Sequence, residues 1–220
     1  AAARLLEEAE GWFALHGPER AGPELTWFSG RQAWLGGDDS AAVDCSSLRE
    51  AVELAQDHGL ARLSTEYRVS LSQCLLEASE PVDALAAALE ARQAASSGEV
   101  LSEWTAWWQA ARAHTALGQT EDAARAYGEA LERLDSHTAQ LRLDALQLGL
   151  EGGRAVAVHG GPSGIYGEAA DALLAASSDP EGVEAALDAL ERGRSRLLLA
   201  SVLGLRAEQA ALPGEPAAPA

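Results

Sequence analysis

The fold is decided by the stretch WWQAARAHTALGQTEDAARAYGEAL, residues 107–131. Its apolar and small residues recur every three or four positions, which is the spacing of one buried face on a helix. The pattern is interrupted once, at Leu117 and Gly118, and such a glycine-containing joint is typical of a turn. Glu121 and Asp122 follow, and acidic side chains are favourable at a helix N-terminus. The stretch therefore predicts two helices joined by a short turn.

The composition extends the helical pattern to the rest of the chain. Its 220 residues include 48 Ala and 33 Leu but only 16 Val, Ile and Thr together. Ala and Leu are strong helix formers, whereas the β-branched residues that suit a pleated sheet are scarce. Short joints containing Gly, Pro or Ser separate segments of roughly 12 to 25 residues, which are ordinary helix lengths. We therefore expect an all-α protein of about eight or nine antiparallel helices without a sheet.

The bulky and small residues of the quoted stretch follow a definite order. Trp107 stands on the first helix, small residues such as Ala110 and Ala123 stand where two helices must approach closely, and Tyr127 follows on the second helix. This order resembles a tetratricopeptide (TPR) unit, which here would span about residues 104–137. The resemblance implies helix pairs that cannot bury their own apolar faces and must stack. The expected architecture is a right-handed α-solenoid of TPR-like antiparallel helix pairs.

Two weaker copies of the unit precede the best one. Residues 65–98 place Ala84, Ala88 and Ala91 on the small face of a second helix, and Ala84 lies 39 positions before Ala123. Because the usual TPR period is about 34 residues, we expect a lengthened joint near Ser96 or an extended helix. A third copy near residues 25–58 keeps large apolar positions but loses the small ones.

The resemblance also implies a binding groove. In TPR units the second, fifth, ninth and twelfth positions of each first helix line the concave face. The residues at these positions of the two later units are Glu66, Val69, Gln73, Leu76, Thr105, Trp108, Arg112 and Thr115. An aromatic side chain beside an arginine is typical of an interface anchor, although Trp108 could equally pack on a neighbouring helix. The chain has no Lys or Asn, so the clamp of chaperone-binding TPR domains is excluded.

A second resemblance concerns the end of the chain. Residues 191–199 read ERGRSRLLL, and Ala, Pro and Glu dominate residues 206–220. A helix of this type that closes a TPR array before a Pro-containing linker resembles the junction before a CHAT domain, a caspase-like cysteine peptidase associated with TPRs. The resemblance implies that residues 1–205 form a TPR-like helical repeat domain and that 206–220 form a flexible linker toward a caspase-like domain. Because the chain contains no Met, we expect it to be a fragment or a processed product.

The charge of the chain limits its partners. With 34 Asp and Glu against 16 Arg, the formal net charge is -18. Such a chain has no basic surface for phosphates, so we expect neither nucleic acid nor an anionic membrane as a partner. No apolar run approaches the ~20 residues of a membrane span. The expected partner is a protein or peptide segment of basic or mixed charge.

The two cysteines do not make a disulfide framework. Cys74 lies in an apolar helical run, where a buried thiol is the usual state, and Cys45 stands at a helix start, where a thiol pKa can be lowered. A chain with two cysteines and no signal peptide pattern is expected to be cytoplasmic.

One string suggests an enzyme. His159-Gly160-Gly161-Pro162 after a short apolar run looks like the oxyanion loop of an α/β-hydrolase peptidase. Such an enzyme also needs a G-x-S-x-G motif between a strand and a helix. The sequence contains no such motif and no pattern of parallel strands to carry it. A helix–helix joint is the better interpretation, and a serine hydrolase is the less favoured alternative.

The remaining histidines and cysteines show no spacing typical of a metal site or of a nucleophile–base pair. We therefore predict no catalytic residue, metal or cofactor. The sequence predicts a non-catalytic interaction module, most simply the recognition arm of a CHAT protease. A stand-alone TPR scaffold or signalling regulator is the alternative.

Overall fold

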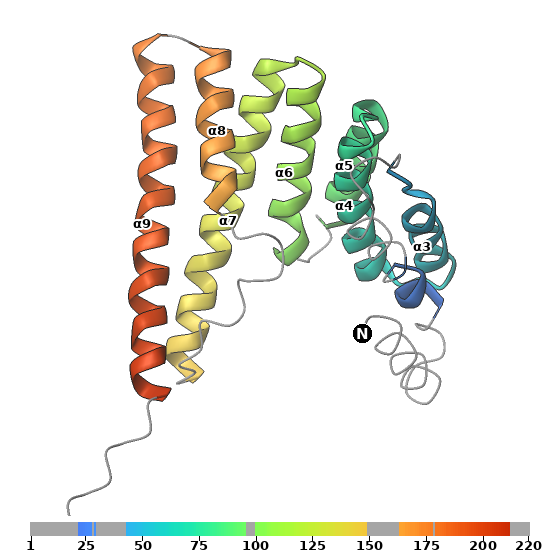
Figure 1. The fold of residues 1–220 in the computed structure, drawn as a ribbon, viewed down its shortest axis with the longest axis horizontal. Helices are drawn as coiled ribbons and strands as arrows, with labels where there is room; N and C mark the ends of the chain where they lie inside the picture. The colour runs from blue at the N-terminus through green and yellow to red at the C-terminus, as the bar shows by residue number, and fades with distance from the viewer. Residues whose placement is uncertain are drawn as a thin grey trace, which may run out of the picture. The chain divides into compact units, whose positions relative to one another are not determined.

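Figure 1 shows a computed structural model of the chain, which describes residues 22–27, 29, 43–95, 100–148, 163–177 and 179–211. The main helices in these ranges are α3 (Ser46–Asp57), α4 (Ala61–Glu77), α5 (Pro81–Ala95), α6 (Val100–Ala116), α7 (Thr120–Leu148), α8 (Ser163–Ala176) and α9 (Pro180–Ala211). No strand occurs in the part of the chain that the structure describes. The expected all-α class is confirmed for these residues.

The chain divides into two compact units, Ala1–Leu134 and Asp135–Ala220, so that the boundary falls inside α7. In the first unit the helices pack in chain order: α3 contacts α4, α4 contacts α5, and α5 contacts α6. In addition, α4 contacts α6, its counterpart in the next helix pair. The core beneath α3 and α4 holds the large side chains of Leu48, Tyr67 and Leu75, each at most 2% exposed. Sequential packing is therefore established within this unit, and superhelical stacking of the whole chain stays a prediction.

The same turn ends the helices α3, α4 and α6. Gly59, Ser79 and Gly118 all have positive φ, at 65°, 61° and 71°. At Gly118, the backbone N–H donates to the Thr115 carbonyl at 3.0 Å, and the next N–H donates to the His114 carbonyl at 2.9 Å. This pair of hydrogen bonds satisfies carbonyl groups that a helix end leaves without partners. It requires one residue in the left-handed backbone conformation, which glycine adopts most readily. The turn predicted at Leu117–Gly118 is confirmed.

The buried positions repeat at the spacing seen in the sequence. Ser79 and Gly118, which occupy the same place in their turns, are 39 residues apart, as are Ala84 and Ala123. Both of these alanines are at most 1% exposed, and the same holds for the alanines seven positions later on their helices, Ala91 and Ala130. The pair α4–α5 and the pair formed by α6 with the start of α7 therefore share one packing pattern. The lengthened joint expected near Ser96 lies outside the described residues.

The second unit is held by a close approach of α8 and α9. A Cβ atom added at Gly193 would lie 2.8 Å from Cβ of Tyr166, so only glycine fits at this crossing. The Tyr166 hydroxyl donates to Oδ1 of Asp135 at 3.3 Å, and Arg192 forms an ion pair with the same carboxylate. These contacts connect the segment of α7 after the unit boundary to both later helices.

The expectation for the cysteines is wrong in one respect. Cys74 is buried as predicted, but it forms a disulfide with Cys45, with the two Cα atoms 6.0 Å apart. The bond joins the start of α3 to the last turns of α4. The cysteines are 29 residues apart, and only the antiparallel packing of these helices brings them together. The disulfide gives the cytoplasmic expectation no support, because such bonds persist mainly in oxidising compartments.

Among the described residues, no helix combines the length and the apolar character needed to cross a membrane.

Candidate functional site

The residues of the expected groove lie on two adjacent helices. The helices α4 and α6, which contact each other, carry four of these residues each. They are Glu66, Val69, Gln73 and Leu76 on α4, and Thr105, Trp108, Arg112 and Thr115 on α6. Val69 is buried and packs with Ala91 and Ala106, and Thr105 is buried as well. Leu76 is half-buried against the main core. Thr115 is exposed, and its hydroxyl donates to the carbonyl of its own helix at 3.0 Å.

The four remaining members of this set are half-buried. They are Glu66, Gln73, Trp108 and Arg112. The Glu66 carboxylate accepts a 3.1 Å hydrogen bond from Arg62 within α4. Trp108 stacks on Trp104 one turn earlier, with ring centroids 6.0 Å apart, and the Arg112 guanidinium lies 5.9 Å from the Trp108 ring. The α4–α6 face therefore carries an aromatic and arginine cluster beside amide and carboxylate groups.

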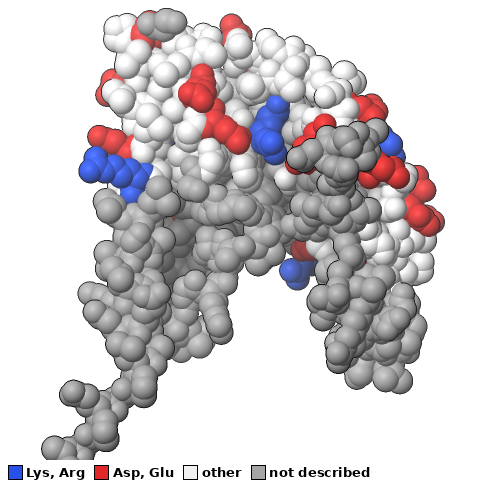
Figure 2. All heavy atoms as spheres, viewed as in Figure 1, with Lys and Arg blue, Asp and Glu red and all other residues white. Residues whose placement is uncertain are grey.

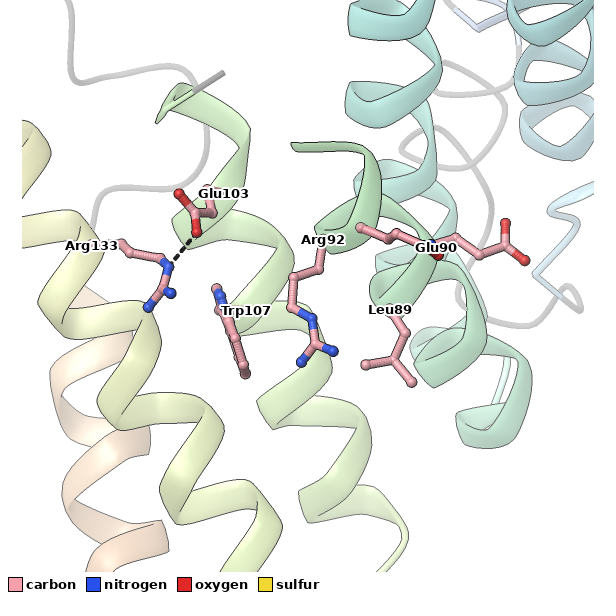
Figure 3. A pocket seen from close by; sticks show the side chains of 7 residues that line it. Leu89, Glu90, Arg92, Glu103, Trp107 and Arg133 are labelled. Carbon is pink, nitrogen blue, oxygen red and sulfur yellow. Dashed lines mark hydrogen bonds and ion pairs between the residues drawn. The ribbon is translucent and has the colours of Figure 1, made fainter. Parts of the chain in front are cut away.

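A pocket of about 460 Å³ lies between α5, α6 and α7 in the first unit, and the sequence did not predict it (Figure 3). A volume of this size falls in the range of small-ligand sites. The residues that line it are Leu89, Glu90, Arg92, Gln93, Glu103, Trp107 and Arg133. We call this cavity the Trp107 pocket.

The Trp107 indole lies between two guanidinium groups. The Cζ atom of Arg92 is 4.3 Å from the ring centroid and that of Arg133 is 5.1 Å from it, and Figure 3 shows them to either side of the ring. Such cation–π contacts contribute roughly 0.5–2 kcal/mol each, depending on desolvation. The Trp107 side chain is half-buried and forms a wall of the pocket. Its buried Nε1–H has no hydrogen-bond partner among the described residues.

The two arginines differ in their electrostatic surroundings. Arg133 forms ion pairs with Glu103 and with Glu129, the first of which Figure 3 marks. Burial disfavours the charged Arg133 guanidinium, but the hydrogen bonds and charges of the two carboxylates outweigh burial and raise its pKa. Arg92 has no carboxylate partner in the part of the chain that the structure describes. The neighbouring Glu90 pairs with Arg68 instead, at 3.0 Å.

Sequence reasoning missed this site because its parts come from three helices. The i,i+4 pair of Glu129 and Arg133 and the same spacing of Glu103 and Trp107 are visible in the sequence. Neither pair indicates which residue of α5 will reach the indole, and Arg92 supplies that contact only through the packing of α5 on α6.

The groups considered for metal binding or nucleophilic catalysis can be followed within the described residues. Within the described ranges, no group of three or more His, Cys, Asp and Glu side chains could hold a metal ion. Both cysteines are bonded to each other. The string His159-Gly160-Gly161-Pro162, on which the hydrolase alternative depends, lies outside the described residues.

Figure 2 shows a face on which basic side chains occur as separate patches among more numerous acidic ones.

Comparison with known proteins does not assign the chain to a family. No protein-family model matches it, and no curated protein is similar to it in sequence. What the described residues define is a class of architecture, an all-helical domain of sequentially packed helices.

Proposed function

We propose that this chain is a non-catalytic, TPR-like protein-interaction module. The observation that carries the proposal is the repetition at 39 residues of one helix–turn–helix pattern, with its left-handed turn residue and its buried alanines. Stacked helix pairs of this kind expose a continuous face made of their first helices, and repeat proteins use such faces to bind other proteins. Here the first helices are α4 and α6, which lie against each other.

The proposed binding face carries Glu66, Gln73, Trp108 and Arg112. Trp and Arg are the residue types most enriched at the energetic centres of interfaces. The formal charge of -18 favours a protein or peptide segment of basic or mixed charge, which would be attracted over long range. We further propose, from the resemblance at residues 191–199, that binding is relayed to an attached caspase-like domain of the CHAT type. We also propose that the protein is located in the cytoplasm.

The binding face is tested with peptides selected from a random display library on the oxidised chain. Trp108→Ala should weaken their binding by about 2 kcal/mol, or roughly 30-fold, because an anchor side chain is lost. Affinity should also fall with added salt, since attraction to a basic segment is screened. Titration calorimetry on Trp108→Ala and Arg112→Ala measures both effects.

The matched control is Val82→Ala on α5, whose side chain is 67% exposed and lies outside the proposed face. Wild-type affinity in both face variants, with helical circular dichroism retained, would exclude the α4–α6 face.

The relay proposal is tested on the gene. A reading frame that continues past Ala220 into a domain with the caspase-like His and Cys pair would support a protease arm. A frame that continues into a DNA-binding domain, or that stops, would favour the stand-alone scaffold or signalling regulator.

A further inference from the structure

Of the two arginines in the Trp107 pocket, one, Arg92, has no carboxylate partner among the described residues. Each of its acidic wall residues is engaged by an arginine: Glu103 by Arg133, and Glu90 by Arg68. Arg133 is shared between two carboxylates, whereas the Arg92 guanidinium lies over the face of the Trp107 indole. Within a chain of net charge -18, the pocket therefore holds a local site for a negative charge.

The side chain of Arg92 is arranged to bind a planar anion. Its guanidinium is a fixed fork of N–H donors that matches the two oxygens of a carboxylate. Stacking on Trp107 at 4.3 Å restricts the fork while its edge stays available, because cation–π contact uses the face of the guanidinium or its charge and not its N–H groups. The buried Nε1–H of Trp107 is a further donor that lacks an acceptor within the described part of the chain.

The chemistry of the pocket selects among anions. The Arg92 guanidinium, which has no carboxylate partner within the described ranges, matches a single negative charge. A polyanion such as a nucleic acid would be repelled by the rest of the chain. The side chains of Leu89 and Trp107 give the pocket apolar walls. A volume of about 460 Å³ accommodates one side chain with its flanking backbone.

We propose that the Trp107 pocket binds a carboxylate of a peptide segment, through Arg92 stacked on Trp107. The pocket lies between α5, α6 and α7 and shares no residue with the α4–α6 face. This inference rests on the proposed interaction function only in taking the ligand to be a peptide. The pocket ligand carries a negative charge, whereas the ligand proposed for the α4–α6 face is basic or of mixed charge.

The test follows the indole N–H resonance of Trp107 in ¹H–¹⁵N spectra of the oxidised full chain, assigned with Trp107→Phe. Three probes are titrated: Nα-acetyl-glutamate amide with a side-chain carboxylate, Nα-acetyl-glycyl-glycine with a terminal carboxylate, and neutral Nα-acetyl-glutamine amide. We expect at least one carboxylate probe to shift this resonance and the neutral probe to leave it in place. The more effective carboxylate probe identifies the source of the carboxylate.

Variants separate this site from the face. Arg92→Gln should raise the dissociation constant at least tenfold, while Arg125→Gln, at an exposed arginine on α7, should not change it. Trp108→Ala should leave the response intact, so that failure of the face and failure of the pocket are distinguishable. Equal shifts with the neutral probe, an unchanged response in Arg92→Gln, or loss of the response in Trp108→Ala would each overturn the proposal.

Discussion

At the scale of single residues, small side chains set the packing of the first unit. Ala84, Ala91, Ala123 and Ala130 are all at most 1% exposed, although alanine buries little apolar area. Their role is to let helix backbones approach, so the space around each has no room for a larger side chain. The alanine spacing was visible in the sequence because helical periodicity is a local property.

Enlarging one of these alanines should therefore destabilise the unit. Ala123→Leu is expected to lower the free energy of unfolding by roughly 1–3 kcal/mol through overpacking. Urea denaturation followed by circular dichroism measures the loss. The control is Ala116→Leu, because Ala116 is exposed at the end of α6 and should accept a leucine with little effect. An unchanged stability in Ala123→Leu would place the repeat pattern elsewhere.

At the scale of helices, the sequence predicted what depends on neighbouring residues and missed what depends on distant ones. The turn at Gly118 and the N-terminus of α7 follow from local residues, and both were predicted. The surroundings of Trp107 and the Cys45–Cys74 bond depend on how separate helices pack, which periodicity does not specify. For the same reason, side chains could be placed on α4 and α6 before the structure, but their burial could not.

The crossing of α8 and α9 makes a test with two glycines. Gly193→Ala should destabilise the second unit, because the new Cβ would lie 2.8 Å from Cβ of Tyr166 and 2.9 Å from its Cγ. Gly167→Ala on α8 has nothing within 4 Å and should stabilise its helix by about 0.5–1 kcal/mol. Opposite changes in melting temperature are expected, and equal changes would contradict the close approach.

The hydrogen bond at the N-terminus of α9 should make the stability of the fold depend on pH. The Gly182 N–H donates to Oδ1 of Asp179 at 2.8 Å and holds the pKa of this carboxyl below its usual value. Since the folded pKa is the lower one, the stabilisation is complete above the unfolded pKa of about 3.9 and is lost as pH falls through the folded value. Asp179→Ser keeps a capping oxygen but does not titrate.

Denaturation between pH 2 and pH 6 measures this contribution. The stability advantage of the wild type over Asp179→Ser should shrink below about pH 4. The control, Asp171→Ser at an exposed position of α8, should leave the acid limb as it is in the wild type. An advantage that grows on acidification would reverse the assigned sign.

At the scale of the whole molecule, the disulfide is the strongest constraint on the unfolded chain. Closing a loop of 29 residues should stabilise the folded state by roughly 3–4 kcal/mol on the chain-entropy account. Reduction should therefore lower the free energy of unfolding by this amount, measured in urea with and without a phosphine reductant. A Cys45→Ala, Cys74→Ala double variant should be insensitive to the reductant. Two thiols that react with an alkylating agent before reduction would contradict the bond.

The same bond changes how the chain responds to force. If the two ends are pulled apart, tension passes through the Cys45–Cys74 bridge and the residues between them carry no load. At about 3.3–3.6 Å per residue, the oxidised chain reaches a contour length shorter by roughly 90–100 Å than the reduced chain. The loop that it shields contains α3 and most of α4. Mechanical work done on the oxidised protein is thus spent on its other helices, and this part of the fold yields to stretching only after a reductant has acted.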